Sequence, residues 1–257
     1  MDNFDIYKLK TAGLTNQQVI NVLEYAEIRE KELSVKDMAV VSECRNPALF
    51  IEKYLQLDDD LLRQEFEKFP SFSILEDVYP WDLSEIYNPP VLLFYKGNLD
   101  LLKLPKVAVV GSRNSSRVGS QSVQKIIKEL NNELVIVSGL ARGIDTSAHM
   151  AALQNGGRTI AVIGTGLDVF YPRSNKKLQS YLGEHHLVLS EYGPEAEPLK
   201  FHFPERNRII AGLCRGVIVA EAKMRSGSLI TCERAMEEGR DVFAIPGSIL
   251  DGRSDGC

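Results

Sequence analysis

The chain has little cysteine and no metal-binding pattern: its 257 residues include four cysteines and four histidines, without a CxxC pair or zinc-finger spacing. We therefore expect reduced thiols and no structural metal. Long apolar runs are also missing, because no stretch approaches the roughly 18 to 20 residues that span a bilayer, and the amino end lacks the layout of a signal peptide. These absences predict a cytoplasmic protein with no membrane partner.

Conventional nucleotide-binding motifs are absent too. No P-loop sequence (GxxxxGK followed by Ser or Thr) occurs, and Gly164 and Gly166 are followed by Val169 where the dinucleotide fingerprint requires a third glycine. No clear ribose-binding acid stands about 20 residues further on. We therefore expect no nicotinamide, flavin or other cofactor.

Basic residues are in the minority. The 30 Lys and Arg against 35 Asp and Glu give a formal net charge of −5, which by itself argues against a nucleic-acid partner. The charge is unevenly spread, however: residues 1–104 hold 11 basic and 19 acidic residues (net −8), whereas residues 105–257 hold 19 and 16 (net +3). This asymmetry indicates a polyanionic partner for the second part of the chain, which the acidic first part should repel.

Three segments differ in composition. Residues 1–66 contain short amphipathic helices, the clearest of which begins with a capping box between Thr15 and Gln18. We interpret them as a small all-α domain for packing or protein contact. Residues 67–104, rich in proline and aromatic residues and with a predicted strand at 91–95, indicate an ordered connector. The third segment comprises residues 105–257.

In this third segment, short apolar strands alternate with helical stretches, which is typical of a parallel sheet with helices on both faces. We therefore predict an α/β fold with a Rossmann-like, doubly wound, mostly parallel sheet. In such sheets ligands bind outside the carboxyl ends of the strands. The predicted strands are 107–110, 134–137, 159–163, 187–189, 216–220 and 242–245, and the predicted helices are 119–131, 145–154, 176–182, 205–211 and 228–238.

Glycine, serine and arginine collect where these strands end. Glycine lets a backbone approach a ligand closely, helix N-termini attract anions, and the planar arginine side chain fits phosphate oxygens. Each arginine alone could be an ordinary solvated or salt-bridged residue, but together they predict a phosphate-binding rim. Its members are Gly111, Ser112, Arg113, Gly139, Arg142, Gly143, Arg206, Asn207, Arg208, Ser226, Gly227 and Ser228.

A series of motifs in the third segment resembles the DNA-processing protein A family (DprA or Smf), in the order in which the family has them. They are VVGSR (109–113), SGLARGIDTSAH (138–149), TIAVIGTGLDVFYP (159–172), SEYG (190–193), FPERNRIIAGL (203–213), EAKMRSGSLIT (221–231) and GRDVFAIPG (239–247). The helical front part is similar to the sterile-alpha-motif-like domain of many members.

The resemblance implies a non-enzymatic protein of natural transformation that binds and protects single-stranded DNA, helps load RecA, and forms a homodimer through the Rossmann-like domain. The family's DNA-contacting basic residues correspond to Arg113, Arg173 and Lys200, and its pocket to the loop 139–143 with Arg206, Asn207, Arg208 and Ser226–Ser228. Family chains normally continue past a segment like 252–257, so we expect the closing elements of the sheet to be missing here and the homodimer contact to be weakened by their loss.

Aromatic residues near the basic ones are candidates for stacking on unpaired bases. They are Phe170, Tyr171, Phe201 and Phe203. The alternative is that these rings belong to the apolar core.

Two other functions remain open from the residues alone. One is a nucleotide-binding hydrolase acting on N-glycosidic bonds, with Asp145, Glu191 and Glu221 as acid or base groups. The opposing interpretation, which we favour, is that Asp145 is a helix N-cap and that the two glutamates are partners of nearby arginines. The other is a scaffold for protein partners. Asp145 and His149 also stand at an i, i+4 spacing that metals use, although an ordinary side-chain contact is favoured.

Overall fold

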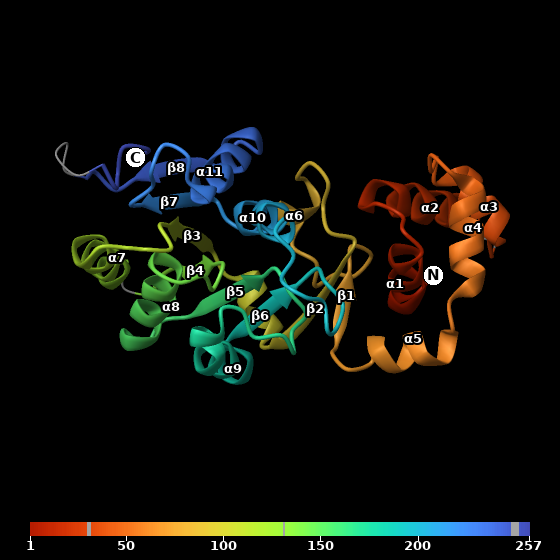
Figure 1. Cartoon of the computed structure of the whole chain (residues 1–257), viewed down its shortest axis with the longest axis horizontal. Helices are drawn as coiled ribbons and strands as arrows, with labels where there is room; N and C mark the ends of the chain where they lie inside the picture. The colour runs from red at the N-terminus through yellow and green to blue at the C-terminus, as the bar shows by residue number, and fades with distance from the viewer. Residues whose placement is uncertain (30–31, 131, 248–251) are drawn as a thin grey trace.

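Short helices form the amino-terminal part of the chain in the computed structural model, which describes residues 1–29, 32–130, 132–247 and 252–257 (Figure 1). They are α1 (Asn3–Thr11), α2 (Asn16–Arg29), α3 (Val35–Val41), α4 (Pro47–Gln56) and α5 (Asp59–Phe66). The predicted capping box is confirmed, since the Thr15 amide donates to Gln18 Oε1 (2.9 Å) and the Gln18 amide to Thr15 Oγ1 (3.3 Å). Short polar side chains cap the other helices: Asp2 and Ser34 form capping boxes, and Asn46 and Asp58 accept amides of the first turn.

An aromatic cluster packs these helices against the rest of the chain. Phe4, Tyr7, Phe66 and Phe94 make a series of ring contacts with centroids 5.4 to 5.7 Å apart. Such pairs contribute about 0.5 to 1.5 kcal/mol each beyond the area that they bury. Since Phe94 belongs to the neighbouring sheet, the helical part shares one apolar core with that sheet.

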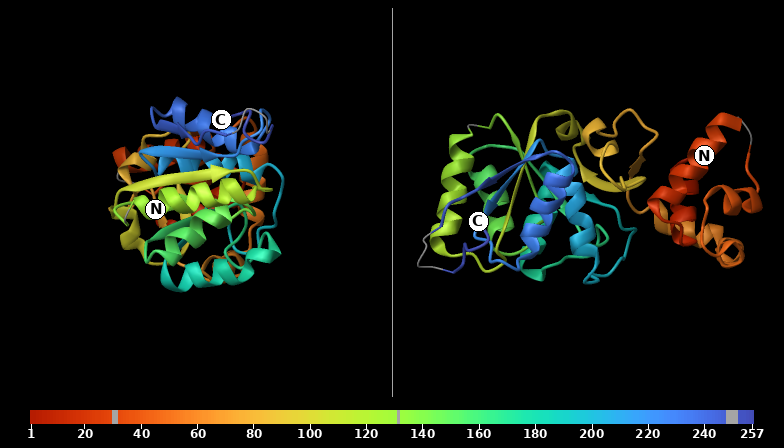
Figure 2. Two further views of the ribbon diagram at one scale, coloured as in Figure 1. Left: turned by 90° about the vertical axis from the view of Figure 1, so that its left-hand side faces the viewer. Right: turned by 90° about the horizontal axis from the view of Figure 1, so that it is seen from above.

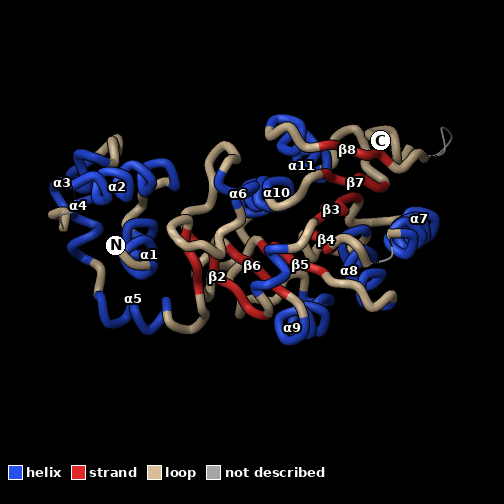
Figure 3. The backbone as a smooth tube through the Cα atoms, turned by 180° about the vertical axis from the view of Figure 1, so that it is seen from behind, coloured by secondary structure: helices blue, strands red, loops and turns tan. Residues whose placement is uncertain are grey.

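Within the described residues an eight-stranded sheet forms the centre of the remaining chain, in the order β1-β2-β6-β5-β4-β3-β7-β8 (Figure 3). From β3 onward the strands are parallel, whereas β2 pairs antiparallel with β6 and β1 with β2. The predicted mostly parallel α/β sheet is therefore confirmed. The strands are β1 (Ser71–Ser73), β2 (Leu92–Gly97), β3 (Lys106–Gly111), β4 (Val135–Ser138), β5 (Thr159–Ile163), β6 (Leu187–Ser190), β7 (Gly216–Ala220) and β8 (Asp241–Ala244).

Helices cover both faces of the sheet, as Figure 2 shows. Val107 and Val109 of β3 pack with α7 and α8, and Ala108 and Val110 pack with α10 and α11 on the opposite face. The remaining elements are α6 (Trp81–Ser84), α7 (Arg117–Glu129), α8 (Ile144–Gln154), α9 (Lys176–His185), α10 (His202–Gly212), α11 (Gly227–Glu237) and the 3₁₀ turns η1 (Leu99–Lys103) and η2 (Arg173–Asn175). None of the described helices combines the length and the apolarity needed to cross a membrane.

Two helices, α7 and α10, begin two or more residues earlier than the sequence predicts. α7 begins at Arg117 because Ser116 Oγ accepts the Gly119 amide (3.0 Å) and caps the helix there. Asn131, the last residue of that predicted helix, lies outside the described residues. α10 begins at His202, since Pro204 falls in the first turn, where backbone amides have no partner within the helix.

Candidate nucleic-acid interface

Two loops are pressed together at the carboxyl end of the sheet, one after β3 and one leading into α8. Gly143, with φ +78°, approaches so closely that a Cβ atom there would overlap the Ser112 carbonyl oxygen. Gly111 is equally confined by the Ala220 carbonyl oxygen of β7. These glycines therefore bring Ser112 and Arg113 beside the start of α8, as the predicted rim requires.

Asn175, a buried residue that was not among the predicted site residues, joins the loop leading into α8 to a further turn. Its Nδ2 donates to Leu140 O (2.9 Å) and to Thr146 Oγ1 (2.8 Å). It thereby holds the loop that carries Arg142 against the turn that carries Arg173, and both of these arginines are exposed. The feature of the sequence that could have pointed to Asn175 is its position in the same polar turn as Arg173.

Aromatic rings and basic side chains gather beside these loops. The Arg113 guanidinium carbon lies 5.4 Å from the centroid of the Phe203 ring, and the Tyr171 ring lies 5.2 Å from the same ring. Tyr171 is 42% exposed and Phe201 is 56% exposed, so neither is a core residue. Arg173 follows Tyr171 by two residues, Lys200 precedes Phe201, and both cations are exposed. We call this set the strand-end surface: Arg113, Tyr171, Arg173, Lys200, Phe201 and Phe203.

Arg206 lies inside the protein rather than on the strand-end surface. Its Nη1 donates to the Gly139 carbonyl oxygen (2.9 Å) and to that of Val162, which connects the ends of β4 and β5. Burial lowers the pKa of Arg206 to about 10, so the side chain stays charged at neutral pH. Burial raises the pKa of the nearby Asp145 carboxyl, and the charge of Arg206 opposes that rise. Gly139 leaves the room for both groups, since a Cβ there would lie 2.8 Å from Asp145 Oδ2.

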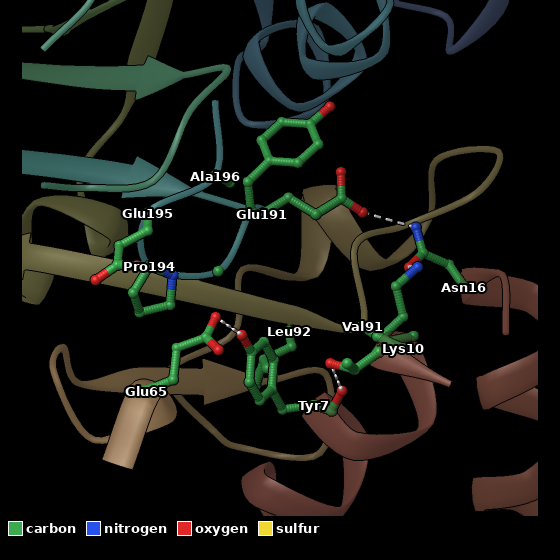
Figure 4. A pocket seen from close by; sticks show the side chains of 13 residues that line it. Tyr7, Lys10, Asn16, Glu65, Val91, Leu92, Glu191, Pro194, Glu195 and Ala196 are labelled. Carbon is green, nitrogen blue, oxygen red and sulfur yellow. Dashed lines mark hydrogen bonds between the residues drawn. The ribbon is translucent and has the colours of Figure 1, made fainter. Parts of the chain in front are cut away.

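Arg208 is also buried and is neutralised by Glu191. Its Nη2 donates to both carboxylate oxygens of Glu191 (2.7 and 2.9 Å). Glu191 also accepts from Asn16 Nδ2 (2.8 Å), and Asn16 Oδ1 accepts from Lys10 Nζ (2.7 Å), beside a pocket of about 360 Å³ (Figure 4). Burial lowers the pKa of Lys10, while the charge of Glu191 opposes this. Arg208 therefore helps to fasten the amino-terminal helices to the sheet domain.

The remaining predicted residues lie where α10 meets α11. Asn207 Nδ2 donates to the Gly227 carbonyl oxygen (3.4 Å). Ser226 caps α11 by accepting the Ser228 amide (3.3 Å), and the two hydroxyls share a 2.7 Å hydrogen bond. These contacts join Asn207 to the segment 226–228, and they do not include Arg113 or the other residues of the strand-end surface.

The three carboxylates of the hydrolase alternative belong to separate networks. Glu191 pairs with an arginine, as the opposing interpretation predicts. Among the described residues Glu221 makes a different contact: it accepts the Ser116 amide (2.6 Å) and so links β7 to α7. The interpretation of Asp145 as a helix N-cap is wrong, because Gly143 occupies that position; Asp145 instead accepts the Gly139 and Ala141 amides (3.2 and 3.3 Å) from the first turn of α8.

His149 is fully buried and hydrogen-bonds through Nδ1 to Thr159 Oγ1 (2.7 Å). Because the Thr159 hydroxyl donates to Ile136 O (2.7 Å), we infer that His149 Nδ1 carries the proton. Over the described parts of the chain, no three His, Cys, Asp or Glu side chains gather as a metal site would require. The contact of His149 is thus an ordinary one with a core hydroxyl.

Acid is expected to destabilise the protein through His149. Burial lowers its pKa from 6.5 to about 3, so between these values the unfolded chain binds a proton that the folded chain does not. The free energy of unfolding then falls by up to about 1.4 kcal/mol for each pH unit of acidification. Urea unfolding from pH 6.5 to 4.5 should show a shallower loss for His149→Leu. The exposed His185→Leu variant is the control and should keep the parent slope; an unchanged slope for His149→Leu would contradict the prediction.

Two protein-family models match the chain: DNA recombination-mediator protein A over residues 71–257, and the sterile alpha motif domain of DNA processing protein A over residues 1–62. The DNA processing protein DprA of Streptococcus pneumoniae is 76% identical over 255 residues, which cover 99% of this chain and 90% of that protein. An X-ray structure of DNA processing protein A from S. pneumoniae matches with a TM-score of 0.98, covering 100% of this chain and 91% of that one. A structure reported for the single-stranded DNA binding mode of DNA processing protein A from Helicobacter pylori matches with a TM-score of 0.65 at 31% identity, covering 73% of this chain and 86% of that one.

Proposed function

Because this chain belongs to the DNA recombination-mediator protein A family, we propose that it binds single-stranded DNA independently of base sequence. The observation that carries the proposal is the strand-end surface, where Arg113, Phe203 and Tyr171 are in contact and exposed cations stand beside them. Single-stranded DNA offers phosphates to cations and unpaired bases to aromatic rings. The strand-end surface combines both kinds of group.

The residues divide into those that would touch DNA and those that hold the surface in shape. Arg113, Arg173 and Lys200 would contact phosphates, since their side chains are exposed. Tyr171 and Phe201 would stack on bases. The buried Arg206 and Arg208, also predicted as phosphate ligands, instead support the loops and α10 from within. Arg142 is exposed on a loop that Asn175 ties to the turn of Arg173 and would add a further cation.

We further propose that the protein protects the bound strand and passes it to RecA during natural transformation, as a non-enzymatic protein of the cytoplasm. The family resemblance supports this role. In the same proposal, residues 105–257 bind DNA and form the homodimer, while residues 67–104 connect them to the helical domain 1–66. The exposed ring of Phe243 (56%) on the edge strand β8 supports the dimer. The hydrolase alternative has less support, because its three carboxylates do not share one site.

Binding to a fluorescent oligothymidylate, followed by anisotropy across a salt series, tests the proposal. The logarithm of the affinity should fall linearly with the logarithm of the salt concentration, with a slope of about 0.7 for each phosphate contacted. A mixed-sequence strand of equal length should bind about as well. No binding at low salt would overturn the proposal, and release of free base from the strand would favour the hydrolase.

A further inference from the structure

The outer face of α9 continues the basic and aromatic character of the strand-end surface. The helix begins directly after the turn that carries Arg173, and Lys177, Tyr181 and His185 follow at four-residue spacing. Residues four apart lie on the same side of a helix, so these side chains form one row. All of them are exposed, and Lys177 and His185 are about 12 Å apart along the helix axis.

A surface groove of about 600 Å³ accompanies this row. Its lining includes Arg173, Lys176 and Lys177 against one acid, Glu184, which leaves a net charge of +2 (three cations minus one carboxylate). Within the described ranges neither Arg173 nor Lys177 has a carboxylate at salt-bridge distance. The groove therefore offers free cations to an anionic ligand.

A pair of stacked rings stands at the far end of the row. Tyr181 and His185 lie with centroids 4.2 Å apart and planes inclined by 16°. A 3.1 Å hydrogen bond between His185 Nδ1 and the Tyr181 carbonyl oxygen holds the imidazole in place. Tyr181 remains 45% exposed. Since the two rings are already parallel, stacking a base on the pair requires little ordering of side chains.

We propose that the α9 row, defined as Lys177, Tyr181 and His185, is a second contact region that carries the single strand beyond Arg173. Lys177 contacts a phosphate, and the Tyr181–His185 pair stacks on a base of a later nucleotide. The inference rests on the proposed function, because the strand reaches α9 from the strand-end surface. It predicts a binding site longer than that surface alone provides.

The dependence of affinity on strand length tests this. Lys177→Ala/Tyr181→Ala should bind the shortest oligothymidylates as the parent does and lose roughly tenfold in affinity once the strand is long enough to reach α9. On long strands its salt slope should be shallower by about 0.7, the value of one phosphate contact. The matched control is Lys125→Ala/Lys128→Ala on the exposed side of α7, which should follow the parent at every length.

The possible outcomes separate the inference from the proposed function. Parent-like binding of the α9 variant at all lengths, or an equal loss at all lengths, overturns the inference alone. A parent protein that binds no strand of any length overturns the proposed function as well. The charge reversal Lys177→Glu is the second variant: it should weaken binding of long strands further and leave short ones unchanged. If an acidic protein binds at Lys177, and the effect of the α9 substitutions on DNA affinity does not depend on strand length, the surface is a protein contact and the inference fails.

Discussion

The triple variant Arg113→Ala/Arg173→Ala/Lys200→Ala is expected to bind single-stranded DNA on the order of 100-fold more weakly than the parent at moderate salt. Three lost phosphate contacts should also reduce the salt slope by about 2, since each contributes about 0.7 on a single strand. The substitutions should leave the fold intact, because all three side chains are exposed and their removal leaves no buried charge without a partner. The cost to stability is expected to be limited to the contact of Arg113 with Phe203, about 0.5 to 1 kcal/mol.

Anisotropy titrations across a salt series measure both effects. The control Lys125→Ala/Lys128→Ala/Arg158→Ala removes the same charge from α7 and from the residue just before β5, away from the carboxyl ends of the strands. If only the net positive charge mattered, the two triple variants would lose DNA affinity equally. Equal affinities for the two variants would therefore reject the strand-end surface as the DNA site.

The second large effect concerns stability. Arg206→Met is expected to lower the free energy of unfolding by about 3 to 5 kcal/mol, because each buried acceptor left without its donor costs about 1 to 3 kcal/mol. The Gly139 and Val162 carbonyl oxygens would lose their donor, and the buried Asp145 would lose the positive charge that offsets its burial. Urea unfolding measures the loss, with the exposed Arg215→Met as the control.

The result also distinguishes two roles for Arg206. If Arg206→Met keeps the parent stability and loses DNA affinity, the residue is a phosphate ligand, as the sequence predicts. If stability falls as expected, Arg206 belongs to the internal support of the site.

The regular part of the fold could be predicted because parallel strands buried on both faces are short, continuous apolar runs. Each predicted strand from residue 105 onward agrees with the structure to within one residue at either end. The antiparallel strand β2 (Leu92–Gly97) was also predicted, at 91–95, whereas β1 was missed because a run of three residues is too short to show a pattern. Capping and a first-turn proline moved the starts of α7 and α10, because these are local hydrogen-bond effects that apolar periodicity does not report.

The candidate site was harder to predict than the fold. Sequence shows that arginines stand near strand ends, but it does not show which way each points. Arg206 and Arg208 are two residues apart on a helix and therefore project about 200° from one another. They could not both face one groove, and in the structure one turns toward the sheet and the other toward the amino-terminal helices. Exposure of Arg113, Arg173 and Lys200 depends on loops whose shape the apolar pattern does not encode.

One consequence concerns α10, which is attached at two distant points. Phe203 in its first turn touches Arg113 and Tyr171, whereas Arg208 in its middle is bound to Glu191, which also holds Asn16 of α2. A helix is a stiff rod, so it cannot shift at one point without moving at the other. A displacement of the amino-terminal helices must break the Asn16–Glu191 hydrogen bond or the Arg208–Glu191 ion pair, or else move α10 and with it the Phe203 ring on which Arg113 rests. Helix α10 therefore couples the position of the acidic amino-terminal helices to that of the loops that carry Arg113 and Tyr171.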